Sequence, residues 1–385
     1  MSTNDDTTAF LIGGAPSENT ALFHRIRFSA GDPAAWIRKP DGSSLLLIRD
    51  IEADRARRDA QVDAVAVPAD FMPEGGLSGD RATATAQATA ECLRRLGMTR
   101  VVLDRSTPYI YAHHLEHAGL VVGYDEDLGV KDRRSKTADE IRALRQAQSD
   151  TEKVMHATLQ RMAHADIDAE GCLVDDEELL TSERVRRWID VALLELGYDN
   201  PGSIVAGGPD AFDCHAHGTG PLRTGEPVIV DIFPLSKSTG YNGDCTRTIV
   251  HGTPTDTVRR MHDAVLAAKA SGVAAVRPGA TGEDVHRATI EVIRDHGFEV
   301  GLPPGDASSE WCGMVHGTGH GVGLQVHEPP LLDFNAPELV VGDVLTIEPG
   351  LYSAAVGGIR IEDMVAVTQT GCENFNRLPE GLSWI

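Results

Sequence analysis

Hydrophobic and polar positions follow two different patterns along the chain, and the change comes near residue 133. In the first part, short apolar runs predict buried strands at residues 43–50, 64–68 and 100–104. Between these runs, charged or Ala/Thr-rich stretches predict helices at residues 52–60 and 81–96. Strands that alternate with helices are typical of α/β domains, so we expect a small α/β domain over residues 1–133.

Residues 134–385 combine helices and strands in a different order. A polar, basic linker at residues 130–136 precedes Thr137 and Glu140, whose spacing is that of a capping box and predicts a long helix to about residue 163. We expect further helices at about residues 175–196, 254–275 and 282–296. Apolar, β-branched runs predict strands at residues 226–233, 246–250, 343–352 and 358–367. Paired strands flanked by helices indicate an α+β domain with an antiparallel sheet over residues 134–385.

Charge and composition narrow the classes of function. The 385 residues include 35 Lys plus Arg against 58 Asp plus Glu, which gives a formal charge of −23. A surface this acidic repels phosphate backbones and anionic lipids, so we expect neither nucleic-acid nor membrane binding. The six cysteines form no CxxC pair and the N-terminal residues do not resemble a signal peptide, so we expect a cytoplasmic protein.

The balance among the charged residues points to habitat. The chain has 6 Lys against 29 Arg and 34 Asp against 24 Glu. Codon bias in a GC-rich genome favours Arg over Lys, but it does not explain the excess of acids. We therefore favour adaptation to a salty cytoplasm, where salt screens the repulsion within an acidic surface.

Four carboxylates in or beside apolar runs need a chemical explanation. Asp231 and Asp244 stand on either side of a turn at residues 236–243, and Glu348 and Glu362 repeat this arrangement around residues 350–358. Two hairpins of this kind could bring all four acids into one cluster. Because buried carboxylates repel one another, such a cluster indicates a pair of hard divalent metals such as Mn²⁺ or Co²⁺.

Histidines lie close to these acids in the sequence. His316, His320 and His327 occur in a glycine-rich stretch, and His215 precedes the first acidic hairpin. One imidazole could bind metal while others polarise substrate. The glycine-rich stretch lacks the third glycine of a dinucleotide loop, and the chain has neither a GK[ST] phosphate loop nor an HExxH zinc signature.

Together, these motifs and their order resemble those of a known enzyme family. DIFP, GDCTRT, HGTGHGVGLQVHE, TIEPGLY and GIRIEDMV, within residues 207–367, are similar to the ordered motifs of the pita-bread metallopeptidases of family M24. That family includes Xaa-Pro aminopeptidases, Xaa-Pro dipeptidases (prolidases), methionine aminopeptidases and creatinase. The front domain resembles that of the prolidase and creatinase branch. The resemblance implies a pita-bread catalytic domain at residues 134–385 behind a creatinase/prolidase-like α/β domain at residues 1–133.

The resemblance also implies a set of site residues. The implied metal ligands are Asp231, Asp244, His320, Glu348 and Glu362, with Asp244 and Glu362 bridging two metals. His215, His316 and His327 match outer histidines that contact substrate. In such a site two divalent ions, Mn²⁺ first and Co²⁺ or Zn²⁺ as alternatives, make hydroxide available from a bridging water, and Glu348 shuttles the proton. His316 and His327 stabilise the developing oxyanion, and a homodimer is the implied assembly.

The substrate is open at this point. The implied function is hydrolysis of Xaa-Pro bonds at the N-terminus of short proline-containing peptides, by an aminopeptidase or a dipeptidase. The same fold and ligand set also serve hydrolases of small non-peptide amides or osmolytes, such as ectoine hydrolase, and this is the alternative. A peptidase-like binding module is a third class, but such relatives usually lose ligands that this chain retains.

Several residues have a second interpretation that is structural. Arg360 either neutralises the acidic cluster or binds the carboxylate of a peptide, and the sequence leaves both open. We expect His113, His114 and His117 to lie on an exposed helix face rather than in a metal site, because no acids converge there. Cys214 and Cys245 are expected to be packing residues rather than nucleophiles.

Overall fold

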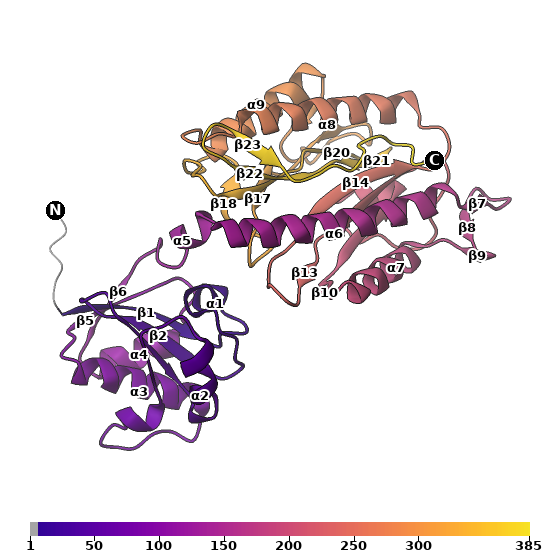
Figure 1. Cartoon of the computed structure of the whole chain (residues 1–385). Coiled ribbons are helices and arrows are strands. Elements are labelled where there is room, and N and C mark those ends of the chain that lie inside the picture. The colour runs from indigo at the N-terminus through magenta and orange to yellow at the C-terminus, as the bar shows by residue number, and fades with distance from the viewer. Residues whose placement is uncertain (1–6) are drawn as a thin grey trace. The chain divides into compact units, whose positions relative to one another are not determined.

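The structure, a computed structural model, describes residues 7–385 (Figure 1), and its internal contacts divide the chain between Arg133 and Arg134. The first unit contains β1 (Thr8–Gly14), α1 (Thr20–Ile26), β2 (Ala34–Arg38), β3 (Ser44–Ile48), α2 (Asp50–Asp59), β4 (Ala64–Ala66), α3 (Arg81–Arg95), β5 (Arg100–Leu103), α4 (Tyr109–His117) and β6 (Val121–Tyr124). A 3₁₀ turn covers Pro68–Phe71, and α5 (Lys131–Arg134) spans the division.

The first unit is a mixed sheet buried on both faces. Its six strands lie in the order β4-β3-β2-β1-β5-β6, with antiparallel pairing among β1, β2 and β3 and parallel pairing elsewhere. Successive residues of β1 point to opposite faces, so Ile12 packs with α1 and α2 while Leu11 packs with α3 and α4. Helices on both faces explain why these strands read as continuous apolar runs.

The second unit carries the remaining elements. They are α6 (Ala138–Ala163), β7 (Asp166–Ile167), β8 (Leu173–Asp175), β9 (Glu178–Leu179), α7 (Ser182–Glu195), β10 (Tyr198–Asp199), β11 (Ser203–Gly207), the 3₁₀ turn η2 (Gly208–Phe212), β12 (Pro227–Ile232), β13 (Leu235–Ser236), β14 (Cys245–Val250), α8 (Asp256–Ala275), α9 (Gly282–Asp295), β15 (Glu299–Val300), β16 (Cys312–Met314), β17 (Gly319–Gly321), β18 (Glu328–Leu332), β19 (Val344–Ile347), β20 (Gly350–Ser353), β21 (Gly357–Arg360), β22 (Asp363–Val367) and β23 (Cys372–Asn374).

Three sheets form the centre of this unit, between two pairs of helices (Figure 1). The sheet β11-β12-β14 packs against α6 and α7, while β20, β21 and their neighbours pack against α8 and α9. The third sheet, β18-β17-β19-β22-β23, packs against the same second pair through β19 and β22. Every residue of β12, β14, β19, β20, β21 and β22 is buried, so polar side chains on these strands must find partners inside the unit.

Three predicted elements differ from the structure. Residues 175–181 are not helical, because β8 and β9 form a hairpin whose turn residues Asp176 and Glu177 have positive φ, and α7 begins only after its cap Thr181. The run at 343–352 is two strands, β19 and β20, in different sheets, and the run at 358–367 is likewise β21 and β22. Pro349 and Glu362 stand at the two breaks.

The basic segment at residues 130–136 is more than a linker. Lys131–Arg134 form the short helix α5. The side chain of Arg134 binds Asp343 at 2.6 Å, and that of Lys136 binds Glu328 at 2.8 Å with both groups almost fully buried. Since a buried charge is tolerated only when it is paired, these contacts fix the start of the second unit against its own core.

In the described part of the chain, no helix has both the length and the apolar character needed to cross a bilayer. His113 and His117 are exposed on α4, as expected, whereas His114 is half-buried. Cys245 is buried in the core of the second unit, as predicted, whereas Cys214 is half-buried beside a cavity.

Candidate metal centre and substrate pocket

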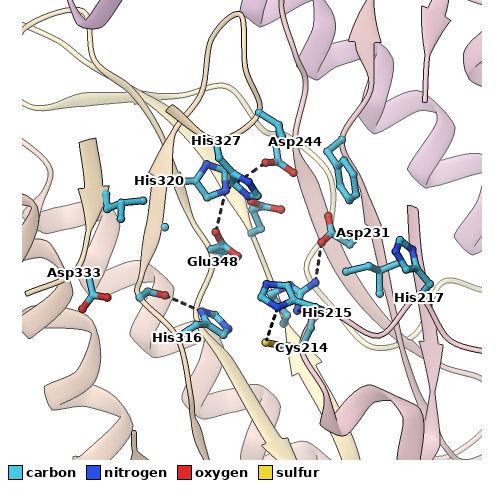
Figure 2. Close-up of a pocket in the computed structure, with 18 residues that line it drawn as sticks. Cys214, His215, His217, Asp231, Asp244, His316, His320, His327, Asp333 and Glu348 are labelled. Carbon is cyan, nitrogen blue, oxygen red and sulfur yellow. Dashed lines mark hydrogen bonds and ion pairs between the residues drawn. The ribbon is translucent and has the colours of Figure 1, made fainter. Parts of the chain in front are cut away.

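All nine residues singled out from the sequence line one cavity of about 410 Å³ in the second unit (Figure 2). They are His215, Asp231, Asp244, His316, His320, His327, Glu348, Arg360 and Glu362. The sequence separation between the first and last of them is large, so only the pairing of distant strands brings them together. The cavity therefore contains every residue that we predicted to bind metal or substrate.

The four acids reach the cavity from two kinds of position. Asp231 lies on β12 opposite Thr246 of β14, and Asp244 immediately precedes β14, as the predicted hairpin requires. We expected Glu348 and Glu362 to lie inside strands. They lie instead at the breaks between β19 and β20 and between β21 and β22. Backbone hydrogen bonds hold both breaks, from the Glu348 N–H to the Thr318 carbonyl at 2.8 Å and from the Glu362 N–H to the Thr246 carbonyl at 3.1 Å.

His320 lies on β17, where the backbone runs unusually close to its neighbours. A Cβ built on Gly319 would lie 2.1 Å from the Thr346 carbonyl oxygen, and one on Gly321 would lie 2.5 Å from that of Glu328. The glycines of this stretch therefore allow the backbone to approach its neighbours more closely than any other residue would. The pairing of β17 with β18 also shifts register between His320 and Gly321, and such an irregularity re-aims a side chain.

The imidazole of His320 points into the acidic cluster (Figure 2). Its Nε2 lies 3.3 Å from Glu348 Oε1 and 3.7 Å from Asp244 Oδ2. One ligand atom from each of Asp244, His320 and Glu362 lies within 4.8 Å of the others, a spacing suited to a metal ion. Hydroxyl groups orient the acids, because Thr246 donates to Glu362 Oε2 at 2.9 Å and Thr346 donates to Glu348 Oε1 at 3.2 Å.

Burial and mutual repulsion of the four carboxylates shift the pKa values of the cluster. Burial and then the neighbouring carboxylates raise the pKa of Asp244 and of Glu362 well above their ordinary values. Burial also lowers the pKa of His320, but its hydrogen bond and attraction to Glu348 outweigh this and raise it. Arg360 and His320 are two cations that face four acids, so all four carboxylates can be ionised together only if further positive charge is bound among them.

Arg360 is almost fully engaged by the protein. Its Nη2 donates to Asp231 Oδ2 at 2.7 Å, and its Nη1 donates to the Tyr352 hydroxyl at 2.9 Å and to the Cys214 carbonyl at 3.1 Å. Its Nε faces Thr246 Oγ1 at 3.4 Å. These contacts favour the first of the two interpretations left open by the sequence, in which Arg360 neutralises the acidic cluster.

The outer histidines differ in how freely they can meet a substrate. His316 Nδ1 lies 2.7 Å from the Gly317 carbonyl, which can only accept, so this nitrogen carries the proton. Its Nε2 lies 2.7 Å from the Tyr352 hydroxyl, so both ring nitrogens already have partners. His327 is exposed, with its ring centroid 4.2 Å from that of His320, and His215 is exposed at the edge of the cavity.

Sequence motifs of the second unit match a described family over most of that unit. The model of metallopeptidase family M24 matches residues 142–369, which is more than half of the chain. The chain belongs to metallopeptidase family M24. The matched range contains all nine cavity residues named above.

Individual M24 relatives match shorter stretches. A Xaa-Pro dipeptidase of Pyrococcus furiosus is 36% identical over 157 residues, which are 40% of this chain and 41% of the relative. A probable dipeptidase PepE of Mycobacterium tuberculosis is 38% identical over 182 residues, which are 46% of this chain and 45% of the relative. The chain thus spans less than half the length of these curated relatives.

Solved M24 structures match nearly the whole chain. The Xaa-Pro dipeptidase of Bacillus anthracis superposes with a TM-score of 0.79, covering 97% of this chain and 94% of the other at 22% identity. The prolidase of Pyrococcus horikoshii gives 0.77, with 98% and 95% covered at 22% identity. At this identity the likeness concerns the fold, and the predicted pita-bread fold is confirmed.

The donor set fits the divalent ions that the family name implies. Asp231 Oδ1 is buried and has no hydrogen-bond partner, and bound cations would allow the four carboxylates of the cluster to be ionised together. Carboxylate oxygens with one imidazole suit hard or borderline divalent metals. Asp231, Asp244, His320, Glu348 and Glu362 are the residues that would hold them.

Sequence reasoning missed two residues that shape this M24 site. Tyr352 joins His316 to Arg360, and its place in the quoted motif TIEPGLY was the available signal. Arg247, fully buried, donates to the carbonyls of Thr246 and Glu362 at 2.9 and 2.5 Å and to Asp363 at 2.9 Å. An arginine inside the apolar run of β14 was a detectable anomaly, and it ties the segments that carry Asp244 and Glu362.

Proposed function

We propose that this protein is a metal-dependent exopeptidase that hydrolyses Xaa-Pro bonds at the N-terminus of short peptides. The convergence of Asp231, Asp244, His320, Glu348 and Glu362 at one end of a single cavity carries the proposal. Relatives that bear the names Xaa-Pro dipeptidase and Xaa-Pro aminopeptidase support it. The proposal covers both activities, since the matched stretches span only part of those relatives.

The acids of the cavity would bind the amino terminus of a peptide, and its apolar wall would contact the proline ring. Asp244 and Glu362 are almost fully buried, whereas Leu331 lines the cavity with an exposed side chain and Asp333 with a half-exposed one, which gives the cavity a closed acidic end and a more open side. A free amino terminus suits the acidic end, and the rest of a peptide then leaves by the open side. Ile204, Phe233, Val326 and Leu331 supply apolar surface for a proline ring.

The catalytic roles follow from the groups present. Bound divalent metals would supply a nucleophile at neutral pH by lowering the pKa of water. Glu348 is the carboxylate placed to take a proton and return it to the proline nitrogen, which has no N–H of its own. His327 and His215 have ring atoms available to a substrate, while both ring nitrogens of His316 are engaged, Nδ1 by the Gly317 carbonyl and Nε2 by the Tyr352 hydroxyl, so His316 would have to give up one of these contacts to bind a substrate.

We propose that the physiological metal is Mn²⁺, with Co²⁺ or Zn²⁺ as alternatives, because four of the five ligands are carboxylates. Arg360 is the one Lys or Arg among the cavity-lining residues of the described chain, and its contacts lie within the protein. We therefore infer that it does not select for the free carboxylate of a dipeptide, so Xaa-Pro-Yaa peptides should be cleaved as well as Xaa-Pro dipeptides.

The test is hydrolysis by the Mn²⁺-loaded full chain of Ala-Pro, Ala-Pro-Ala and ectoine in parallel. We expect both peptides to be cleaved, and Glu348→Gln to reduce kcat at least about 100-fold because the proton shuttle is lost. Glu310→Gln, at an exposed position outside the cavity, is the matched control and should behave like the wild type. Turnover of ectoine faster than that of either peptide would overturn the proposal.

A further inference from the structure

A second group of metal-binding side chains lies at the edge of the same cavity. One ligand atom from each of Asp213, Cys214 and His215 lies within 4.8 Å of the others. Cys214 Sγ is 3.8 Å from His215 Nδ1, and Asp213 Oδ1 accepts the backbone N–H of His215 at 2.9 Å. Figure 2 shows the sulfur of Cys214 next to the His215 ring, on the same side of the cavity as Asp231.

Local backbone structure explains how three successive side chains converge. The 3₁₀ turn η2 ends at Phe212, and Asp213 follows in an extended conformation with φ −83° and ψ 114°. The chain then turns, as the hydrogen bond from the Ala216 N–H to the Asp213 carbonyl at 3.1 Å shows. Asp213 and His215 are exposed and Cys214 is half-buried, so a cation can reach the group from solvent.

The donor set differs in kind from that of the main centre. A thiol sulfur, an imidazole nitrogen and one carboxylate form the mixed set that Zn²⁺ or Cd²⁺ prefers, with water completing a tetrahedron. The main centre has four carboxylates and one imidazole, which suit a harder ion. The softer donor set of the second group therefore favours thiophilic ions more strongly than the main centre does.

Occupation of the second group would affect the cavity directly. Cys214 and His215 both line it, and the Cys214 carbonyl accepts a hydrogen bond from Arg360. An imidazole bound to a cation on its Nδ1 side is fixed in orientation and carries added positive charge. His215 would then be unavailable to position a substrate.

We propose that Asp213, Cys214 and His215 form an inhibitory site for a thiophilic divalent cation such as Zn²⁺ at the edge of the substrate cavity. On binding, the Cys214 thiol releases its proton to solvent, the sulfur and the His215 Nδ1 lone pair form bonds to the ion, and no oxidation state changes. The inhibition rests on the proposed function of the cavity, whereas the binding does not.

The binding is tested by titrating the Mn²⁺-loaded full chain with Cd²⁺ and recording the ultraviolet charge-transfer band of a cadmium thiolate. We expect one equivalent to give the band in the wild type and Cys214→Ser to abolish it. Cys312→Ser removes another half-buried thiol, which does not line the cavity, and should retain the band. A band that survives in Cys214→Ser, or that is lost in Cys312→Ser, would overturn the site.

The inhibition is tested by titrating hydrolysis of Ala-Pro-Ala with Zn²⁺ while Mn²⁺ is held in excess. With the activity of each protein expressed relative to its own rate without Zn²⁺, Cys214→Ser should need at least about tenfold more Zn²⁺ than the wild type for half inhibition, because one of three protein ligands is lost. Equal midpoints would show that Zn²⁺ acts at the main centre, which overturns the inhibitory role. Absence of any peptide hydrolysis would refute the proposed function, and the cadmium band would still decide the site.

Discussion

Replacement of Arg360 by methionine should reveal what the buried Arg360–Asp231 pair contributes. The two side chains are 4% and 12% exposed and their charged atoms lie 2.7 Å apart. Methionine keeps most of the volume and removes the charge, which leaves the Asp231 carboxylate among three other acids. It also removes the donor to the Tyr352 hydroxyl, so the change disturbs the contact that holds His316.

The expected cost follows from burial. Breaking a buried ion pair by removing one partner destabilises proteins by about 3–5 kcal/mol, because the remaining charge stays desolvated. The pair of Arg145 and Glu373 has a similar separation, 2.8 Å, but its side chains are 45% and 44% exposed. Arg145→Met is therefore the matched control, and it should cost about 1 kcal/mol or less.

The assay is denaturant unfolding of both variants, first with a chelator and then with Mn²⁺. With chelator, the free energy of unfolding of Arg360→Met should be lower than that of the wild type by the full amount, about 3–5 kcal/mol. With Mn²⁺ the deficit should shrink, because a bound cation compensates Asp231 and binding to the folded state adds stability. Hydrolysis of Ala-Pro and of its amide should fall by the same factor, since the proposed role of Arg360 does not involve the substrate carboxylate.

Two results would refute this reasoning. A stability loss no larger than that of Arg145→Met would show that the buried pair is not needed to balance the cluster. A loss of Ala-Pro cleavage much greater than that of the amide would show that Arg360 binds the peptide carboxylate, which is the other interpretation of this residue.

Three further predictions concern the metals, the surface charge and the glycine-rich strand. Asp244→Asn should remove both metals and Asp231→Asn only one, because only the first is proposed to bridge, and elemental analysis after dialysis would measure this; equal losses would contradict the bridging role. The melting temperature should rise between low and molar salt as screening reduces the repulsion within a chain of formal charge −23. An unchanged melting temperature would contradict adaptation to salt and favour codon bias as the explanation of the composition. Gly319→Ala should unfold the strand locally and abolish metal binding, since its Cβ would lie 2.1 Å from the Thr346 carbonyl oxygen. Gly305→Ala, with open space around it, should change neither the strand nor the metal content. An intact metal content in Gly319→Ala, by the same elemental analysis, would contradict the close-approach argument.

The sequence predicted which residues form the candidate site better than it predicted the backbone positions that hold them. Asp231 and Asp244 could be placed because a short turn between two apolar runs predicts a hairpin, and that hairpin is present as β12 and β14. Glu348 and Glu362 were recognised as anomalous acids in apolar runs. Their actual positions, at breaks where the chain passes from one sheet to another, have no local signature beyond Pro349.

Long-range contacts explain the remaining misses. Arg360 could not be assigned a role from its sequence, because its partners Asp231, Tyr352 and the Cys214 carbonyl are brought to it only by the assembled sheets. The helix predicted at residues 175–196 is present as α7, but its start was placed too early, because the hairpin of β8 and β9 overrides a sequence rich in helix-forming acids. Propensity is a local quantity, and these features are tertiary.

The division of the candidate ligands between distant segments also sets an order of assembly during synthesis. Asp231 and Asp244 are translated roughly 100 residues before Glu348 and Glu362, an interval of about 5–20 s at typical elongation rates. During that interval the first hairpin exists without the late ligands, without Arg360 and without the strands that cover it. Retention of two ions thus requires a chain that has been synthesised at least as far as Glu362, so the proposed cofactors are loaded only after the late ligands have emerged and paired with the first hairpin.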